Sequence, residues 1–140
     1  MSESDTVHLD LPADYKYLNV LGSCIAEMLA RVEELARPDE IISNMQLAVH
    51  EVCVNIVKHA YNNNNSERIR ITLTVLQNPR QFVVDLVDTG CSFDPSGVSA
   101  PNLDDMQVHG YGLFLAQQLL HTVTYYPQPD HNRWQLAKNL

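Results

Sequence analysis

Residues 38–61 form the segment that most restricts how this chain can fold. One side of a helix over "PDEIISNMQLAVHEVCVNIVKHAY" would be continuous hydrocarbon, at about 100° per residue. Pro38 suits a first helical position, and the helix dipole favours Asp39 and Glu40 in the first turn. The pattern therefore predicts a helix from Pro38 to about Tyr61 whose apolar side is buried.

The opposite side of this helix carries a narrow polar stripe. Glu51, Asn55, Lys58 and His59 fall within an arc of about 100°, whereas His50 points away from them. A solvated face of an amphipathic helix is the simpler interpretation. Apolar residues flank the stripe closely, so the lining of a cleft also fits, and this helix alone leaves both interpretations open.

Hydrophobic patterns divide the rest of the chain into further elements. Apolar residues three to four apart predict helices over residues 15–35 and 110–121. Alternation predicts five strands, over residues 6–13, 67–77, 81–90, 122–127 and 133–139. Residues 90–109 contain no clear element, and a loop of that length in a compact domain is often a functional lid.

The order of these elements predicts the fold class. Strands and helices are mixed without strict alternation, and short turns join two pairs of consecutive strands, 67–77 with 81–90 and 122–127 with 133–139. We expect a single α+β domain over residues 1–140. It would be a two-layer sandwich with three helices on one face of a mixed, mostly antiparallel sheet.

Composition narrows the possible partners and the compartment. The formal net charge is −8, with 17 acidic against 9 basic residues, and there is no basic cluster of the kind that nucleic-acid binding needs. No apolar run approaches the ~20 residues of a membrane span, and the first residues show no export signal. We therefore expect a cytoplasmic protein without nucleic-acid or membrane partners, in which Cys24, Cys53 and Cys91 are reduced thiols.

The polar stripe suggests a magnesium–phosphate site rather than a zinc site. A zinc-protease motif beginning at His50-Glu51 requires a second histidine at position 54, where the chain has Val54. Glu51 and Asn55, four residues apart, place two hard oxygen groups on one face. Asn55 would suit a magnesium ligand, and Glu51 would be free to orient or deprotonate a nucleophile.

Two glycine-bearing stretches add weaker signals. Asp88 ends a hydrophobic strand just before Gly90, where it can accept a hydrogen bond from the amino group of a base; an ordinary strand-closing turn explains the same residues. Gly110 and Gly112 open a predicted helix, whose free amides attract phosphate, although a glycine-rich helix start is equally simple. Neither stretch matches a Rossmann or Walker motif.

In combination the three motifs are specific. "ExxxNxxKHAY", "DxGxxFDP" and "GYGLFL" in this order resemble the ATP-binding (GHKL or Bergerat) fold shared by gyrase, histidine kinases and MutL-type repair ATPases. Within it, the chain most closely resembles the anti-sigma factor serine/threonine-protein kinases of bacterial partner-switching systems. The resemblance covers nearly the whole chain and implies the sandwich fold described above.

The resemblance also implies a role for each matching residue. It implies ATP and Mg²⁺ as ligands, with Asn55 on the metal, Glu51 as the general base, Asp88 on the adenine amino group and Gly90 at the base edge. Lys58 and His59 would line the site or support it. The implied nucleotide-binding set is Asn55, Lys58, His59, Asp88, Gly90, Phe93, Gly110, Tyr111, Gly112 and Leu113.

The family further implies partners. The substrate would be a serine or threonine on an anti-sigma factor antagonist with a STAS domain; a sigma factor held inactive would be a second partner, and homodimers are usual. Two alternatives remain: a nucleotide-dependent anti-sigma module with little kinase activity, and a stand-alone ATPase. The intact Glu51 favours the kinase, because a pure binder needs no base.

Two departures from the family pattern stand out. The lid "CSFDPSGVSAPNLDDMQV" contains no Lys or Arg to face a terminal phosphate, so Lys58 or a partner subunit would have to supply the charge. Cys91 follows Gly90 directly, and we expect it to be packed rather than redox-active.

Overall fold

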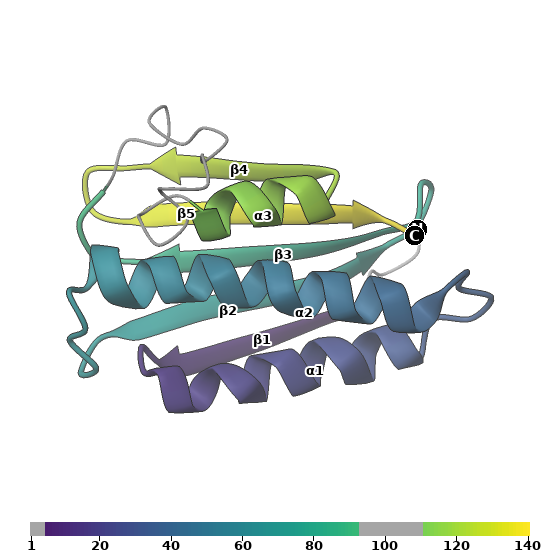
Figure 1. The fold of residues 1–140 in the computed structure, drawn as a ribbon, viewed down its shortest axis with the longest axis horizontal. Coiled ribbons are helices and arrows are strands. Elements are labelled where there is room, and N and C mark those ends of the chain that lie inside the picture. The colour runs from purple at the N-terminus through teal and green to yellow at the C-terminus, as the bar shows by residue number, and fades with distance from the viewer. Residues whose placement is uncertain (1–4, 93–110) are drawn as a thin grey trace.

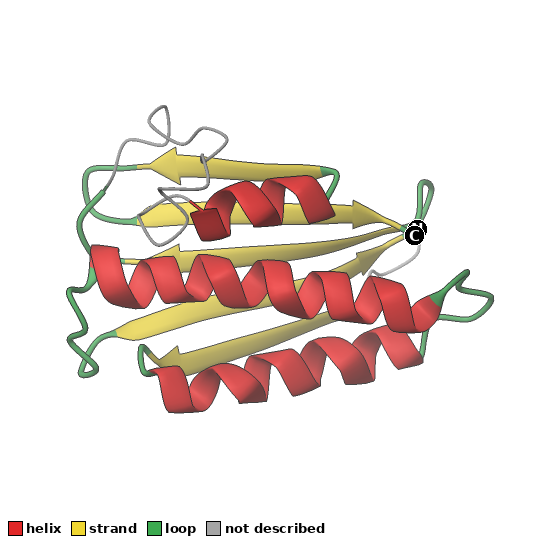
Figure 2. Cartoon of the chain, in the orientation of Figure 1, coloured by secondary structure: helices red, strands yellow, loops and turns green. Residues whose placement is uncertain are grey.

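A layer of three helices covers one face of a five-stranded sheet (Figures 1 and 2). The structure is a computed structural model that describes residues 5–92 and 111–140. The helices are α1 (Leu18–Ala30), α2 (Pro38–Asn55) and α3 (Tyr111–Leu119), with a 3₁₀ turn η1 (Tyr15–Tyr17) and a π-helical turn η2 (Ile56–Ala60). The strands are β1 (Asp5–Pro12), β2 (Arg68–Leu76), β3 (Gln81–Asp88), β4 (Thr122–Pro127) and β5 (Asn132–Asn139).

The strand order in the sheet is β1-β2-β3-β5-β4, and each of these neighbouring pairs is antiparallel. The predicted two-layer α+β sandwich is therefore confirmed. The sheet was expected to be mixed and mostly antiparallel, whereas all four of these strand pairs are antiparallel. The chain crosses from β3 to β4 through α3, and β5 then returns between β3 and β4. This arrangement brings the ends of β3 and β5 together.

Alternating residues divide the sheet into a buried face and an open face. In β2, Ile69, Ile71, Leu73 and Val75 are buried under the helices, while the residues between them are more exposed. Phe82, Val84 and Leu86 of β3 continue the buried layer, as do Trp134 and Leu136 of β5. Burying an aliphatic or aromatic side chain of this size stabilises the fold by about 1.5–3 kcal/mol.

The middle helix α2 begins as its sequence predicts. Pro38 occupies the first helical turn together with Asp39 and Glu40. Its apolar side packs on the sheet, and Met45, Val49, Val52 and Cys53 are almost completely buried. Desolvation raises the pKa of the Cys53 thiol to about 12, so this cysteine stays protonated inside the core.

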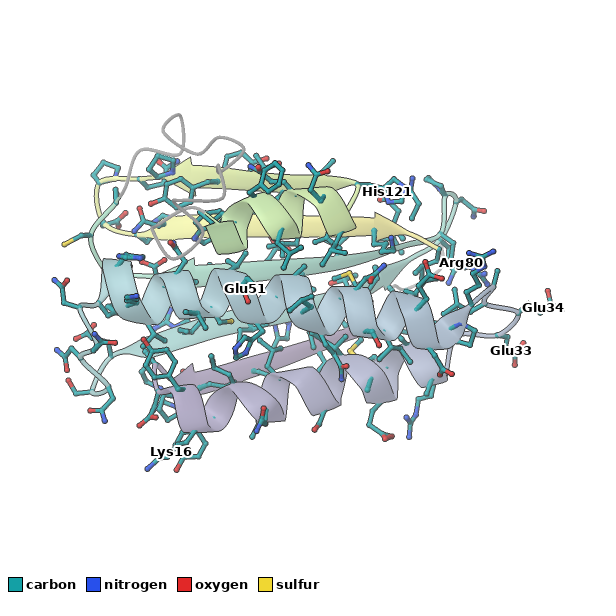
Figure 3. The ribbon with its side chains drawn as sticks, in the orientation of Figure 1. Lys16, Glu33, Glu34, Glu51, Arg80 and His121 are labelled. Atoms are coloured by element: carbon teal, nitrogen blue, oxygen red, sulfur yellow. The ribbon has the colours of Figure 1, made fainter. Side chains whose placement is uncertain are left out.

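The first helix is shorter than predicted. The pattern extends it to residue 35, whereas α1 ends at Ala30. Glu34 and Arg37 then adopt positive φ angles of 55° and 52° as the chain turns toward α2. Arg80, from the β2–β3 turn, donates hydrogen bonds to the carbonyls of Glu33 (2.8 Å) and Glu34 (3.4 Å), so a tertiary contact holds this loop (Figure 3).

The end of the middle helix is a π-helical turn rather than regular α-helix. The Tyr61 N–H donates to the carbonyl of Ile56 at 3.0 Å, five residues back. A π turn inserts extra backbone and rotates the following residues about the helix axis. The polar stripe is therefore regular only through Asn55, and Lys58 and His59 lie in the widened turn.

Most of the predicted lid lies outside the described residues, which end at Ser92 and resume at Tyr111. Phe93 and Gly110 belong to that segment. Within the described residues, none of the helices combines the length and apolar character that crossing a membrane would require.

Candidate functional site

Four elements meet at one end of the sandwich. The C-terminal half of α2, the end of β3, the beginning of α3 and the beginning of β5 lie together on the left of Figure 1. The predicted site residues of the three motifs come from these elements, from η2 directly after α2, or from the segment that joins β3 to α3. The fold therefore places side by side motifs that are far apart in the sequence.

Glu51 of α2 faces the first turn of α3. A Cβ atom built on Gly112 would collide with Oε2 of Glu51 and would lie 3.3 Å from its Cδ. The carboxylate thus occupies the space that any side chain at position 112 would need. An anionic group is favoured beside the N-terminus of a helix, where unpaired N–H groups point outward. Figure 3 shows Glu51 in the middle of the helix layer.

Asn55 lies one helical turn after Glu51, about 6 Å along the axis of α2. Both side chains are half-buried. Within the described part of the chain neither side chain makes a hydrogen bond or an ion pair, so their oxygens are available to a ligand. The pair offers hard oxygen donors of the type that Mg²⁺ prefers.

The remaining predicted groups on α2 and η2 differ in exposure. Lys58 is exposed and forms no ion pair with any residue the structure describes, whereas His59 is half-buried. His50 is exposed and lines a groove of about 620 Å³ between α1 and α2, and Glu51 is not part of the lining of this groove. Among residues 5–92 and 111–140, no group of three or more His, Cys, Asp or Glu side chains is placed to bind a metal.

Asp88 ends β3 inside the protein, with only 1% of its surface exposed. Its Oδ1 accepts hydrogen bonds from the Gly90 N–H and from Nδ2 of Asn132, both at 2.9 Å. Burial raises the pKa of the carboxyl, while these two bonds and the charge of His131 act in the opposite direction. Between the described residues no hydrogen bond uses Oδ2, which leaves that oxygen for a ligand.

Gly90 lies directly against the end of η2. A Cβ at this position would collide with the carbonyl oxygen of Ala60 and lie 2.6 Å from its carbonyl carbon. The Cys91 N–H donates to the same oxygen at 2.8 Å. Cys91 itself is exposed, so the expectation that it is packed is wrong. The backbone bond fixes Cys91 on η2 without burying its side chain.

Replacing Gly90 with alanine should lower the free energy of unfolding by about 1–3 kcal/mol, because the added methyl group forces backbone apart. Gly22→Ala is the matched control. Its Cβ meets nothing closer than Nε2 of Gln46 at 4.0 Å, and alanine favours a helix by up to about 1 kcal/mol over glycine. Urea unfolding of both variants measures the difference. Equal stability of the two would contradict the close approach of Gly90 to Ala60.

Two residues of the site were not predicted from the sequence. Asn132, at the start of β5, is as buried as Asp88 and bonds to it. Tyr61 donates its hydroxyl to the Arg68 carbonyl and accepts from the Thr89 N–H, both at 2.7 Å. The only sequence signal for Asn132 is a polar residue at a strand start, which becomes informative once β3 and β5 are known to pair.

The other predicted residues are partly described. Leu113 is buried in the core. Tyr111 and Gly112 form the first turn of α3, and of Tyr111 only the backbone is described.

Besides the α1–α2 groove, a cleft of about 530 Å³ lies between β1, β2 and the end of α1. Neither hollow includes Glu51, Asn55 or Asp88.

Comparison with known sequences identifies relatives over almost the entire chain. A family model described as a histidine kinase-like ATPase domain matches residues 11–138. The serine-protein kinase RsbW of Staphylococcus aureus is 31% identical over 137 residues, which cover 91% of this chain and 83% of the relative.

Solved structures show the same fold at lower identity. The RsbU and RsbW domains of a Mycobacterium tuberculosis protein superpose with a TM-score of 0.70 and 16% identity, over 99% of this chain and 33% of that one. The SiaB–SiaC complex from Pseudomonas aeruginosa gives a TM-score of 0.61 at 14% identity, over 96% and 89% of the two chains. At these identities the likeness concerns the fold alone.

Proposed function

Because the chain belongs to the histidine kinase-like ATPase family, we propose that it is an ATP-dependent protein serine/threonine kinase that acts as an anti-sigma factor in a partner-switching system. Its protein substrate would be an anti-sigma factor antagonist with a STAS domain. The 31% identical relative is itself named a serine-protein kinase. The observation that carries the proposal is the position of Glu51, whose carboxylate lies against Gly112 at the start of α3.

That position suits a general base. The first N–H groups of a helix have no partner within the helix and favour phosphate, and Glu51 lies beside the first turn of α3. A serine hydroxyl that approached the terminal phosphate would therefore meet a carboxylate able to accept its proton. A protein that only binds nucleotide has no need of a carboxylate there.

The other described residues fit a nucleotide and its metal. Asp88 offers a buried acceptor for the adenine amino group, and Gly90 leaves its backbone free of a side chain at the base edge. Asn55 offers a neutral oxygen one turn from Glu51. Mg²⁺ held there would neutralise charge on the phosphates. Lys58 is exposed and adds a positive charge near the end of α2, where the lid sequence has none.

The transfer would proceed by direct displacement. The substrate hydroxyl gives its proton to Glu51 while its oxygen forms a bond to the γ-phosphorus. The bond between that phosphorus and the bridging oxygen breaks, and its electron pair stays on ADP. Phosphoserine or phosphothreonine results, and Glu51 releases the proton to solvent. Positioning and charge neutralisation would supply most of the rate enhancement.

The lid composition supports one alternative. Residues 91–108 contain no Lys or Arg, so a protein that binds ATP and a sigma factor without much phosphoryl transfer is the second candidate. Its distinguishing feature would be nucleotide binding with no labelled product. We also propose a cytoplasmic homodimer as the working form.

Asn55→Ala should weaken ATP binding in the presence of Mg²⁺ by at least about 10- to 100-fold, because the substitution removes a metal ligand. Titration calorimetry with and without Mg²⁺ measures the effect, and the variant should lose most of its magnesium dependence. Asn44→Ala is the matched control, on the same side of α2 about three turns earlier. Unchanged affinity in Asn55→Ala would remove this residue from the site.

A further inference from the structure

Asn132 and Asp88 form a buried polar pair across two strands. They are directly opposed in the β3–β5 register, and each is 1% exposed. Among the described residues, they are the buried side chains that carry an amide or a charge. A buried amide is costly unless its hydrogen bonds are made, so its partners show what it does.

Among the residues the structure describes, every hydrogen-bond partner of the Asn132 side-chain amide belongs to the Asp88–Ser92 segment. Nδ2 donates to Oδ1 of Asp88 (2.9 Å) and to the carbonyl of Gly90 (3.0 Å). Oδ1 of Asn132 accepts from the Ser92 hydroxyl at 2.6 Å. Because a carboxylate and a carbonyl can only accept, these contacts also fix which end of the amide carries the nitrogen.

The two oxygens of the Asp88 carboxylate therefore differ in their hydrogen bonding. Oδ1 of Asp88 receives both the Asn132 amide and the Gly90 N–H, whereas Oδ2 accepts no bond from the described residues. Rotation of the carboxylate would break both bonds to Oδ1. Asn132 also holds the Gly90 carbonyl, so the backbone that follows Asp88 is fixed by the same side chain.

We infer that Asn132 is a positioning residue that presents Oδ2 of Asp88, as an acceptor, to the base and thereby sets a preference for adenine over guanine nucleotides. Adenine carries an amino donor at C6, and guanine carries a carbonyl acceptor there. An ionised, fixed carboxylate pairs with the first and repels the second. This inference rests on the proposed ATP-binding function.

The Asn132 amide also affects the protonation of Asp88. Burial raises the pKa of Asp88, and the Asn132 bond is the largest influence that opposes this rise. Without that bond, the carboxyl would be protonated more easily and could donate toward a carbonyl instead of accepting from an amino group. Loss of Asn132 should therefore reduce discrimination between bases as well as affinity.

The test compares ADP and GDP binding by calorimetry in wild-type protein and in Asn132→Leu, which keeps a similar size but removes the amide. We expect ADP affinity to fall about 10- to 100-fold while the weak GDP affinity stays, so the ADP/GDP ratio approaches one. In transfer assays the KM for ATP should rise with kcat retained. Asn139→Ala, exposed at the far end of β5, is the matched control and should bind as wild type.

If Asn132→Leu does not fold, Ser92→Ala provides a second test of the same inference. Ser92 is exposed, and its substitution removes only the bond to Asn132 Oδ1, so a loss of ADP affinity of about 2- to 10-fold is expected. An unchanged ADP/GDP ratio in Asn132→Leu, or equal weakening of both nucleotides, would overturn the inference. Wild-type protein that binds neither nucleotide would instead overturn the proposed function.

Discussion

Glu51→Gln should lower the rate of phosphoryl transfer by about 10²- to 10⁴-fold and leave ATP binding within about twofold of wild type. Glutamine has the size of glutamate but cannot accept the proton of the substrate hydroxyl. It also still fits the space beside Gly112, so the contact between α2 and α3 should persist. Initial rates at saturating ATP, together with a direct titration of ADP, separate the two effects.

Glu40→Gln provides the matched control for this substitution. Glu40 lies in the first turn of the same helix, where it is exposed and pairs with Arg37 at 3.5 Å. An exposed pair of this kind contributes little to stability, and transfer by this variant should match wild type. A Glu51→Gln enzyme with normal kcat would show that another group accepts the proton.

Asp88→Asn should weaken adenine-nucleotide binding by about 100-fold or more. The bonds from Asn132 and Gly90 would hold the new amide with its oxygen at the Oδ1 position and its nitrogen at the Oδ2 position. Two donors would then face each other, the side-chain amide and the adenine amino group. Loss of a bond to a charged acceptor together with this opposition accounts for the expected size.

The same variant should be more stable than wild type at pH 7. Burial raises the pKa of Asp88, so the folded protein prefers the neutral carboxyl. Stability from this group is present below the unfolded pKa and is lost as pH rises through the folded pKa. Asparagine is neutral at every pH. Its melting temperature should therefore exceed that of wild type at pH 7, and the difference should shrink toward pH 4.

Asp85→Asn is the control for both measurements. Asp85 lies on the same strand but faces the open side of the sheet, where it pairs with Arg133 at 2.7 Å. Its substitution should leave nucleotide binding unchanged and should not raise the melting temperature. Unaltered ATP affinity in Asp88→Asn, with affinity retained in Asp85→Asn, would exclude Asp88 from base recognition.

Local sequence signals predicted most of the fold. The strand over 122–127 agrees with β4 at both ends, and Pro38 correctly marks the start of α2. The end of α1 could not be predicted, because Arg80, far along the chain, holds the loop that follows it. The π turn at Ile56–Ala60 also depends on how the helix packs, which a hydrophobic pattern does not reveal.

In the candidate site, too, local spacing predicted some residues, whereas others depend on contacts between distant parts of the chain. Glu51 and Asn55 could be paired from helical spacing alone, because both lie on regular α-helix. Asn132 could not, because its partner Asp88 is 44 residues away and meets it only through the strand register. The contact between Glu51 and Gly112 likewise arises from the packing of α2 against α3.

The most direct test of the kinase proposal is transfer of the γ-phosphate. Purified protein is incubated with γ-labelled ATP, Mg²⁺ and a STAS-domain protein encoded in the same genome, and mass spectrometry locates the modified residue. The proposal predicts label on a serine or threonine of the STAS-domain protein with wild type, and almost none with Glu51→Gln. Binding of ATP by the wild type without any labelled protein, across the STAS-domain proteins of that genome, would contradict it.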